Sequence, residues 1–171
     1  MIIGIVCVDK NWGIGKKNDL LFHLKKDMQF FKQTTADSIV FCGYNTLLSF
    51  PGSKPLKGRS TICLCPSEVE RDDCFCVHDF DEAVKLVREL SKTKPVFVIG
   101  GAMLYKSMLP YYDKVYVNKV DADGEAEVFF PNLDTYDGMR LHQLLPEIED
   151  EGYKTRLYVY VKNIPLEELI G

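Results

Sequence analysis

The chain has 171 residues, of which 46% are hydrophobic and 27% are charged, and its formal net charge is −4. This size and composition predict one globular domain with a substantial core. The acidic balance argues against a dedicated nucleic-acid or membrane-surface protein, whose footprint would be basic, so neither kind of partner is expected.

The first predicted element is the apolar run "IIGIVCV" at residues 2–8. It is much shorter than the ~20 apolar residues of a membrane span, and no basic leader precedes it. We therefore expect a buried first strand here, and neither a signal peptide nor a membrane anchor.

Short apolar runs then alternate with helical patterns along the chain. Strands are predicted at residues 2–8, 38–43, 60–65, 75–78, 95–101 and 114–120, and helices at 24–34, 44–50, 80–92 and 102–109. Several strands are apolar on both faces, which indicates a sheet covered by helices on each side. The fold class expected is α/β: a single domain with a mixed, mostly parallel sheet of about eight strands and about four helices.

The C-terminal third has a different pattern. Two strand-like segments, "MRLHQLL" and "YKTRLYVYVKN", are separated by the acidic stretch "PEIEDEG" and by no helix. We expect an antiparallel hairpin at the sheet edge, with the acidic stretch as its turn.

The cysteines occur partly in pairs, Cys63 with Cys65 and Cys74 with Cys76. An i, i+2 spacing in a strand puts both thiols of a pair on one face of the sheet. A zinc site usually takes C-x2-4-C from a turn, so free buried thiols in a reducing cytoplasm are expected, and no metal.

The helix expected at 24–34 carries an acid on its apolar side. Asp27 lies one turn from Leu24 and Phe31. An acid in the first turn can simply complement the helix dipole. The preceding loop has two glycines and many apolar side chains, so it could instead close over a pocket that contains the acid. With Lys32 and Arg59 at its rim, such a pocket suits a flat heterocycle with an acidic tail.

Two strand–helix junctions contain glycine, Gly43 in one and Gly100 with Gly101 in the other. A helix N-terminus attracts anions, and glycine lets an anion approach the backbone. Together the two junctions could hold a dinucleotide diphosphate at the carboxyl ends of the strands, although each glycine could merely end a strand. The Rossmann fingerprint is not present, because "GIGKKN" at 13–18 has only its first two glycines and is expected to open a polar loop.

Six motifs together make the chain resemble the dihydrofolate reductase family over about residues 1–162, with 163–171 as a C-terminal extension. They are "GIG..ND", "LKKDMQFFKQTT", "G.NT", "PLKGR", "VIGGAMLY" and "FFP", in family order. The resemblance implies a cytoplasmic, monomeric enzyme that reduces 7,8-dihydrofolate to 5,6,7,8-tetrahydrofolate with NADPH. It also implies a cis peptide between Gly100 and Gly101, which is an unusual geometry for non-proline residues.

The resemblance also assigns roles to residues. Asp27 would anchor and polarise the pterin, with Phe22 and Asn118 as the other catalytic positions. Arg59 would bind the α-carboxylate of the glutamate tail, with Lys32 near the outer carboxylate. The remaining substrate contacts implied are Ile5, Cys7, Leu20, Met28, Phe31, Phe50, Leu56, Ile99 and Tyr105. The cofactor contacts implied are Cys7, Ile14, Gly15, Asn18, Leu20, Gly43, Tyr44, Asn45, Thr46, Leu64, Cys65, Pro66, Ile99, Gly100, Gly101, Ala102, Met103, Leu104 and Tyr105.

The sequence departs from the family pattern at several of these positions. Phe22 replaces a tryptophan whose indole N–H holds a water, and Asn118 replaces a threonine but can still donate a hydrogen bond to the acid. Val128 stands where a polar residue is common.

The family's usual groups around the 2′-phosphate of NADPH are missing as well. Tyr44, Pro66 and Met103 occupy those positions. Unless Ser67 or Arg71 compensates, we expect weaker selectivity against NADH than is usual in the family, so NADH stays open as an alternative cofactor. Two other functions stay open: a paralogue that reduces another pterin or a pyrimidine, and a folate-binding module with low turnover.

Overall fold

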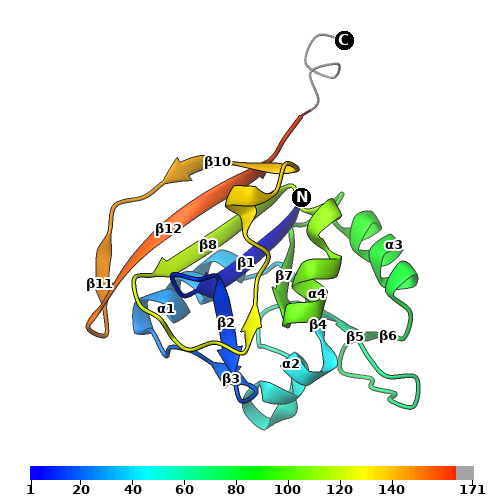
Figure 1. Cartoon of the computed structure of the whole chain (residues 1–171). Coiled ribbons are helices and arrows are strands. Elements are labelled where there is room, and N and C mark those ends of the chain that lie inside the picture. The colour runs from blue at the N-terminus through cyan, green and yellow to red at the C-terminus, as the bar shows by residue number, and fades with distance from the viewer. Residues whose placement is uncertain (165–171) are drawn as a thin grey trace.

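The structure, a computed structural model, describes residues 1–164, so most of the predicted extension at 163–171 lies outside the described residues. A large twisted sheet runs through the molecule, with helices on both of its faces (Figure 1). Its strands lie in the order β10 (Met139–Leu144), β12 (Tyr153–Lys162), β8 (Lys114–Val120), β1 (Ile2–Val8), β7 (Val96–Gly100), β4 (Ile39–Gly43), β5 (Ser60–Leu64) and β6 (Phe75–Val77). The strands from β8 to β6 pair in parallel, whereas β12 pairs antiparallel with both β8 and β10. The predicted α/β class with a mixed, mostly parallel sheet is confirmed.

The hairpin at the sheet edge differs from the prediction in one respect. The acidic stretch is not only a turn, because Ile148–Asp150 forms a further strand, β11, paired antiparallel with β12. The first residue of β11, Ile148, pairs with Thr155, which lies farther along the chain. Because charged residues are depleted in strands, the composition of this stretch does not indicate a strand.

Four α-helices are described: α1 (Lys25–Thr35), α2 (Tyr44–Ser49), α3 (Phe80–Leu90) and α4 (Ala102–Ser107). Each lies within two residues of its predicted bounds. Helix α3 shows why the pattern was readable, because Asp79 caps its start by accepting the Glu82 N–H at 3.2 Å, and Ala83, Val84 and Val87 bury one face.

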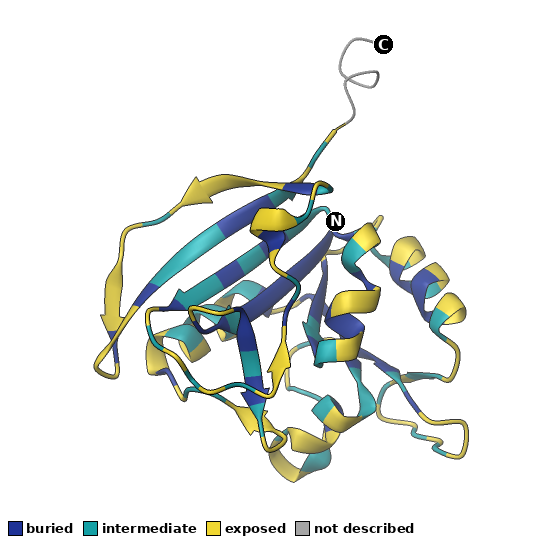
Figure 2. Cartoon of the chain, in the orientation of Figure 1, coloured by how far each residue is buried: buried dark blue, intermediate teal, exposed yellow. Residues whose placement is uncertain are grey.

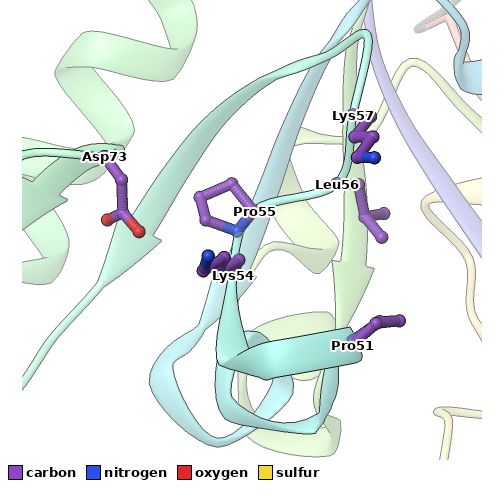
Figure 3. Close-up of a pocket in the computed structure, with 6 residues that line it drawn as sticks. All are labelled: Pro51, Lys54, Pro55, Leu56, Lys57 and Asp73. Atoms are coloured by element: carbon purple, nitrogen blue, oxygen red, sulfur yellow. The ribbon is translucent and has the colours of Figure 1, made fainter.

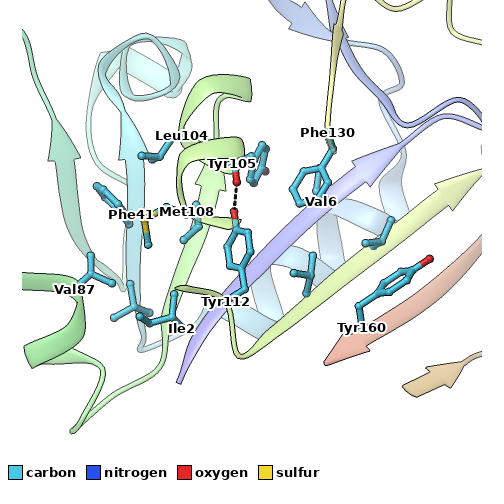
Figure 4. Close-up of a cluster of buried hydrophobic side chains, with 14 of the residues drawn as sticks. Ile2, Val6, Phe41, Val87, Leu104, Tyr105, Met108, Tyr112, Phe130 and Tyr160 are labelled. Carbon is cyan, nitrogen blue, oxygen red and sulfur yellow. Dashed lines mark hydrogen bonds between the residues drawn. The ribbon is translucent and has the colours of Figure 1, made fainter. Parts of the chain in front are cut away.

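Side-chain alternation in β1 separates two layers of core. Val6 and Val8 belong to the large cluster under α3 and α4, whereas Ile3 and Ile5 face α1. Figure 2 shows the buried strands between helices whose outer faces are exposed. In the large cluster, shown in Figure 4, the Tyr112 hydroxyl donates to the backbone oxygen of Tyr105 at 2.9 Å. Odd-numbered positions of β1 thus face α1, and the candidate acid lies on that helix.

A small second sheet stands beside the main one. It consists of β3 (Asp19–Leu20), β2 (Gly13–Lys16) and β9 (Val128–Phe129). The expectation of a loop throughout "GIGKKN" was therefore wrong, because β2 pairs with β9, more than 100 residues away, and local patterns do not report such pairing. We call residues 10–23 the flap.

The flap is anchored by Asp9, which is 1% exposed. Its carboxylate accepts the N–H groups of Asn11 and Gly13 at 2.8 Å and that of Gly124 at 2.9 Å. One buried carboxylate therefore joins the base of the flap to the segment that precedes β9.

Candidate active site

Three polar side chains from distant parts of the chain meet between α1 and the sheet. Cys7 on β1 stands in register with Asn118 on β8, and both lie on the face of the sheet toward α1. Asp27, in the first turn of α1, accepts a hydrogen bond at Oδ1 from Asn118 Nδ2 at 2.9 Å. The acid and the amide that the sequence analysis singled out are thus in direct contact.

The environment of Asp27 favours its protonated form. Burial raises the pKa of Asp27, the hydrogen bond from Asn118 opposes this, and the negative charge of Asp150 raises it further. Burial, together with the charges of Asp27 and Asp150, also raises the pKa of Cys7, so that thiol stays protonated and is a poor nucleophile. The carboxyl of Asp27 is therefore the acid at this position whose proton is held to a higher pH than usual.

Apolar side chains surround this polar group. The predicted wall residues Ile5, Phe31 and Ile99 pack together on the α1 face of the sheet, and Phe50 packs against the neighbouring cluster that also contains Ile99. Met28, another predicted wall residue, is 60% exposed. A flat ring placed against Asp27 would therefore meet mostly hydrocarbon.

Two of the predicted site residues, Leu20 and Phe22, belong to the flap. Leu20, at the end of β3, is 61% exposed. Phe22 is half-buried and meets the ring of Tyr153 edge to face, with the centroids 4.9 Å apart. Phe22 therefore contributes apolar cover and offers no hydrogen-bond donor.

A guanidinium stands at the far end of α1. Arg59 Nε donates to Thr35 Oγ1 at 2.8 Å, its Nη1 donates to the Lys57 oxygen at 2.7 Å, and the group lies 5.9 Å from the Phe31 ring centroid. These contacts fix the direction of its planar fork. Lys32 is exposed on the same helix. The two cations suit a ligand that extends along α1 and ends in carboxylates.

A cavity of about 540 Å³ lies beyond Leu56 (Figure 3). It is lined by Pro51, Lys54, Pro55, Leu56, Lys57 and Asp73. Of these lining residues, only Leu56 is a predicted substrate contact. The one acid that lines the cavity, Asp73, forms an ion pair with Arg71. Asp27 is not among its lining residues.

The two glycine junctions lie side by side. A Cβ at Gly43 would lie 3.9 Å from both the Gly100 oxygen and the Gly101 nitrogen, and a Cβ at Gly101 would lie 3.5 Å from Thr46 Oγ1. Helices α2 and α4 begin at these junctions, and no side chain caps either of them. The peptide Gly100–Gly101 is cis, which confirms that expectation. Backbone N–H groups with no side chain in front of them fit the phosphates of a dinucleotide.

The other predicted cofactor residues are buried to different degrees. Leu104 and Tyr105 are buried in the core cluster under α4, and the Tyr105 hydroxyl donates to the Ile5 oxygen at 2.8 Å. Exposed or half-buried positions are Ile14, Asn18, Tyr44, Asn45, Thr46, Leu64, Pro66, Ala102 and Met103, while Gly15 and Cys65 are buried.

The basic and hydroxyl groups suggested near a 2′-phosphate have acidic partners. Arg71 donates to both oxygens of Asp73, at 2.9 and 2.7 Å, and also to the Ser53 oxygen at 2.8 Å. Ser67 Oγ lies 3.4 Å from a carboxylate oxygen of Glu68. Met103, one of the positions where the family has a different side chain, is 85% exposed.

Five of the six cysteines gather around β4, β5 and β6, whereas Cys7 lies beside Asp27, and all six are free. Cys42, Cys63 and Cys76 are in register on β4, β5 and β6. Burial is the main cause that raises the pKa of Cys65, whereas a hydrogen bond to Cys42 is the main cause for Cys63. Within residues 1–164, no three His, Cys, Asp or Glu side chains are grouped so that they could hold a metal ion.

Two buried acids with structural contacts to the site were missed by sequence reasoning. Asp9 had a local signal, since an aspartate that precedes turn residues often accepts backbone N–H groups. Asp150 had none, because its partners at the start of α1 lie more than 120 residues away.

Comparisons with known proteins agree over most of the chain. Residues 1–162 match a family described as "Dihydrofolate reductase". Proteins of that name from Bacillus subtilis and Bos taurus are 33% and 30% identical, in alignments covering 78% and 93% of this chain and 77% and 96% of theirs. A solved structure titled "Dihydrofolate reductase from Enterococcus faecalis complexed with NADP(H) and RAB-propyl" has a TM-score of 0.82 and 27% identity, and covers 96% of this chain and 97% of that one. No helix in the described part of the chain is long and apolar enough to cross a membrane.

Proposed function

The chain belongs to the dihydrofolate reductase family, and we propose that Asp27 is the residue around which it reduces 7,8-dihydrofolate to 5,6,7,8-tetrahydrofolate with NADPH. The observation that carries this role is the contact between Asp27 and Asn118 inside an apolar surround. The reaction itself follows from the family, whereas the roles of individual residues are our proposal.

Asp27 binds the polar edge of the pterin, its 2-amino group and N3. The carboxyl can serve there because Asn118 fixes one of its oxygens and leaves the other for the substrate. When bound, NADPH would supply a hydride from its nicotinamide to C6 of the pterin. N5 of the pterin must then gain a proton, which comes from a water admitted by the flap.

The raised pKa of Asp27 increases the fraction of this carboxyl that is protonated at a given pH, and the protonated form polarises the pterin for protonation. The rate of reduction should therefore fall as pH rises through the pKa of Asp27. Phe22 contributes cover alone, because its ring has no N–H to hold the water.

The rest of the substrate lies along α1. The aminobenzoyl ring packs against Phe31 and Phe50, and Arg59 receives the α-carboxylate of the glutamate through its planar fork. Lys32 lies near the outer carboxylate, where its exposure predicts a weaker and salt-dependent contribution.

The paired glycine junctions would hold the cofactor phosphates. The open backbone at Gly43 and Gly101, whose junctions lie within a few ångströms of each other, supports this placement of a diphosphate. NADH is proposed as an alternative cofactor, because Asp73 already neutralises Arg71 and Met103 offers no charge. A 2′-phosphate would thus gain little over a 2′-hydroxyl.

The proposal also covers the cellular compartment and the oligomeric state. Six free cysteines support a reducing compartment, the cytoplasm, and the enzyme is proposed to act as a monomer. Neither nucleic acid nor a membrane is proposed as a partner.

The direct test follows the loss of NADPH absorbance with dihydrofolate as substrate, and then repeats it with NADH. Turnover with dihydrofolate supports the proposal. Tight binding of dihydrofolate without turnover would favour a folate-binding module, and turnover of a different pterin or a pyrimidine alone would favour a paralogue.

A further inference from the structure

Helix α1, which carries Asp27, begins without a capping side chain of its own. The residue before it is Leu24, which is buried and extended and makes no capping hydrogen bond through its side chain. The first N–H groups of a helix have no partner within the helix, and a Ser, Thr, Asp or Asn at the N-cap usually accepts one of them. Without another partner, Asp27 would sit on a turn free to fray.

A carboxylate from the far end of the chain supplies the missing acceptors. Asp150 Oδ1 accepts the Lys26 N–H at 3.2 Å, and Oδ2 accepts the Asp27 N–H at 3.0 Å. These are the second and third residues of α1, whose N–H groups are the ones an N-cap side chain binds. Asp150 is the last residue of β11 and is 2% exposed.

The strand that carries Asp150 is joined to the start of α1 at further points. Lys26 Nζ donates to the Glu149 oxygen at 2.6 Å. The Tyr153 ring, at the start of β12, packs against Phe22 of the flap. Figure 1 shows β11 beside α1. The contact is therefore a small interface between the β11–β12 turn and the segment 22–27, with Asp150 as its buried centre.

We propose that Asp150 is a positioning residue for the reduction, which holds the first turn of α1 and so fixes where the Asp27 carboxyl meets Asn118 and the substrate. This inference rests on the proposed role of Asp27. A carboxylate suits the task better than a neutral cap, because it accepts two N–H groups at once and complements the positive end of the helix dipole.

The same carboxylate also acts on the charge of Asp27. Asp27 faces Cys7 on β1, Asn118 on β8, Tyr105 on α4 and Asp150 on β11. Burial raises the pKa values of Cys7 and Tyr105, so both stay uncharged near neutral pH, and Asn118 does not titrate. Asp150 is the charged member of this set, and its charge raises the pKa of Asp27. Loss of that charge should lower the pKa of Asp27.

Two substitutions separate the contacts from the charge. Asp150→Asn keeps the size and one acceptor oxygen but removes the charge, whereas Asp150→Ala removes both acceptors. Glu151→Gln is the matched control, because it removes an exposed charge from the adjacent position of the same turn. The measurements are kcat and KM for dihydrofolate across pH and the Kd for NADPH, with thermal melts as the test of folding.

Asp150→Asn should move the falling limb of the pH–rate profile to lower pH by about half a unit, as expected for the loss of one nearby charge. Asp150→Ala should in addition lower kcat about tenfold, because Asp27 loses its fixed position, with the Kd for NADPH unchanged. Glu151→Gln should change neither quantity.

Folded Asp150→Asn with the wild-type pH profile and wild-type kcat would overturn the proposal. So would equal effects of Asp150→Asn and Glu151→Gln. Asp27→Asn, measured in parallel, distinguishes the two levels of the account: if it leaves the rate and the profile unchanged, the role of Asp27 fails, and if it alone has an effect, the role of Asp150 fails.

Discussion

Replacing Asn118 by leucine removes the donor to Asp27 with little change in size. When Asp27 is ionised, it then loses a hydrogen bond to a charged group, for which about 1.5–3 kcal/mol is typical. Asp27 is only half-buried, so water compensates in part, and the lower end of that range applies. We expect the free energy of unfolding to fall by about 1–2 kcal/mol near pH 8.

The pH dependence of this loss is the more specific part of the prediction. The hydrogen bond from Asn118 lowers the pKa of Asp27, so Asn118→Leu should raise that pKa and move the falling limb of the pH–rate profile to higher pH. Below the pKa of Asp27 the carboxyl is neutral, and the lost bond matters less. The destabilisation near pH 4 should therefore be smaller than that near pH 8.

Urea unfolding at the two pH values measures the stability change, and Asn118→Thr is the control because a hydroxyl retains a donor at this position. Equal destabilisation at both pH values would show that Asn118 acts through packing alone. A pH–rate profile that stays in place would contradict the electrostatic part of the reasoning.

The remaining predictions concern the tail, the cofactor and the stability of the site. Arg59→Lys should raise KM for dihydrofolate ~10-fold, because lysine lacks the planar fork, and leave the KM for NADPH unchanged; a change confined to the cofactor would show that Arg59 is misassigned. Asp73→Asn should release Arg71 and lower KM for NADPH several-fold relative to NADH, whereas an unchanged ratio would place the 2′-phosphate elsewhere. Asp27→Asn should raise the melting temperature near pH 8 but not near pH 3. Because the pKa of Asp27 is raised in the folded protein, the wild type loses stability as pH rises from the unfolded value of 3.8 through the folded pKa. The amide of the variant does not ionise, so the variant avoids this loss. A lower melting temperature near pH 8 would mean that burial does not oppose the charge of Asp27.

Much of the main sheet could be read from the sequence because its signals are local. The strand at Ile39–Gly43 is a continuous apolar run that ends in glycine, and α3 has both a cap at Asp79 and an apolar stripe. Asp27 could be recognised as unusual because one helix turn shows which residues share its face.

Other features depend on pairing between distant segments. Strand β2 forms because Gly13 and Gly15 have no side chains and allow β9 to pair closely with them. Nothing within residues 13–16 indicates that β9 is the partner. Asp150 appears in the sequence as one acid among four in an exposed-looking turn, and only the folded chain brings it to the start of α1.

The availability of Arg71 for the 2′-phosphate of NADPH could not be predicted from the sequence. Sequence reasoning counted the positive charge but could not see that Asp73, two residues away, would hold it in a bidentate pair. Whether a cation is available depends on side-chain geometry, which spacing alone does not determine.

The most direct test of the role of Asp27 is the turnover of Asp27→Asn with dihydrofolate and NADPH near neutral pH. The asparagine keeps the size of the side chain and an oxygen that can accept from Asn118, but it cannot ionise. We expect kcat to fall ~100-fold or more, the scale typical of acid–base participation. Near-normal turnover in a folded variant would contradict the account and require another group to serve the pterin.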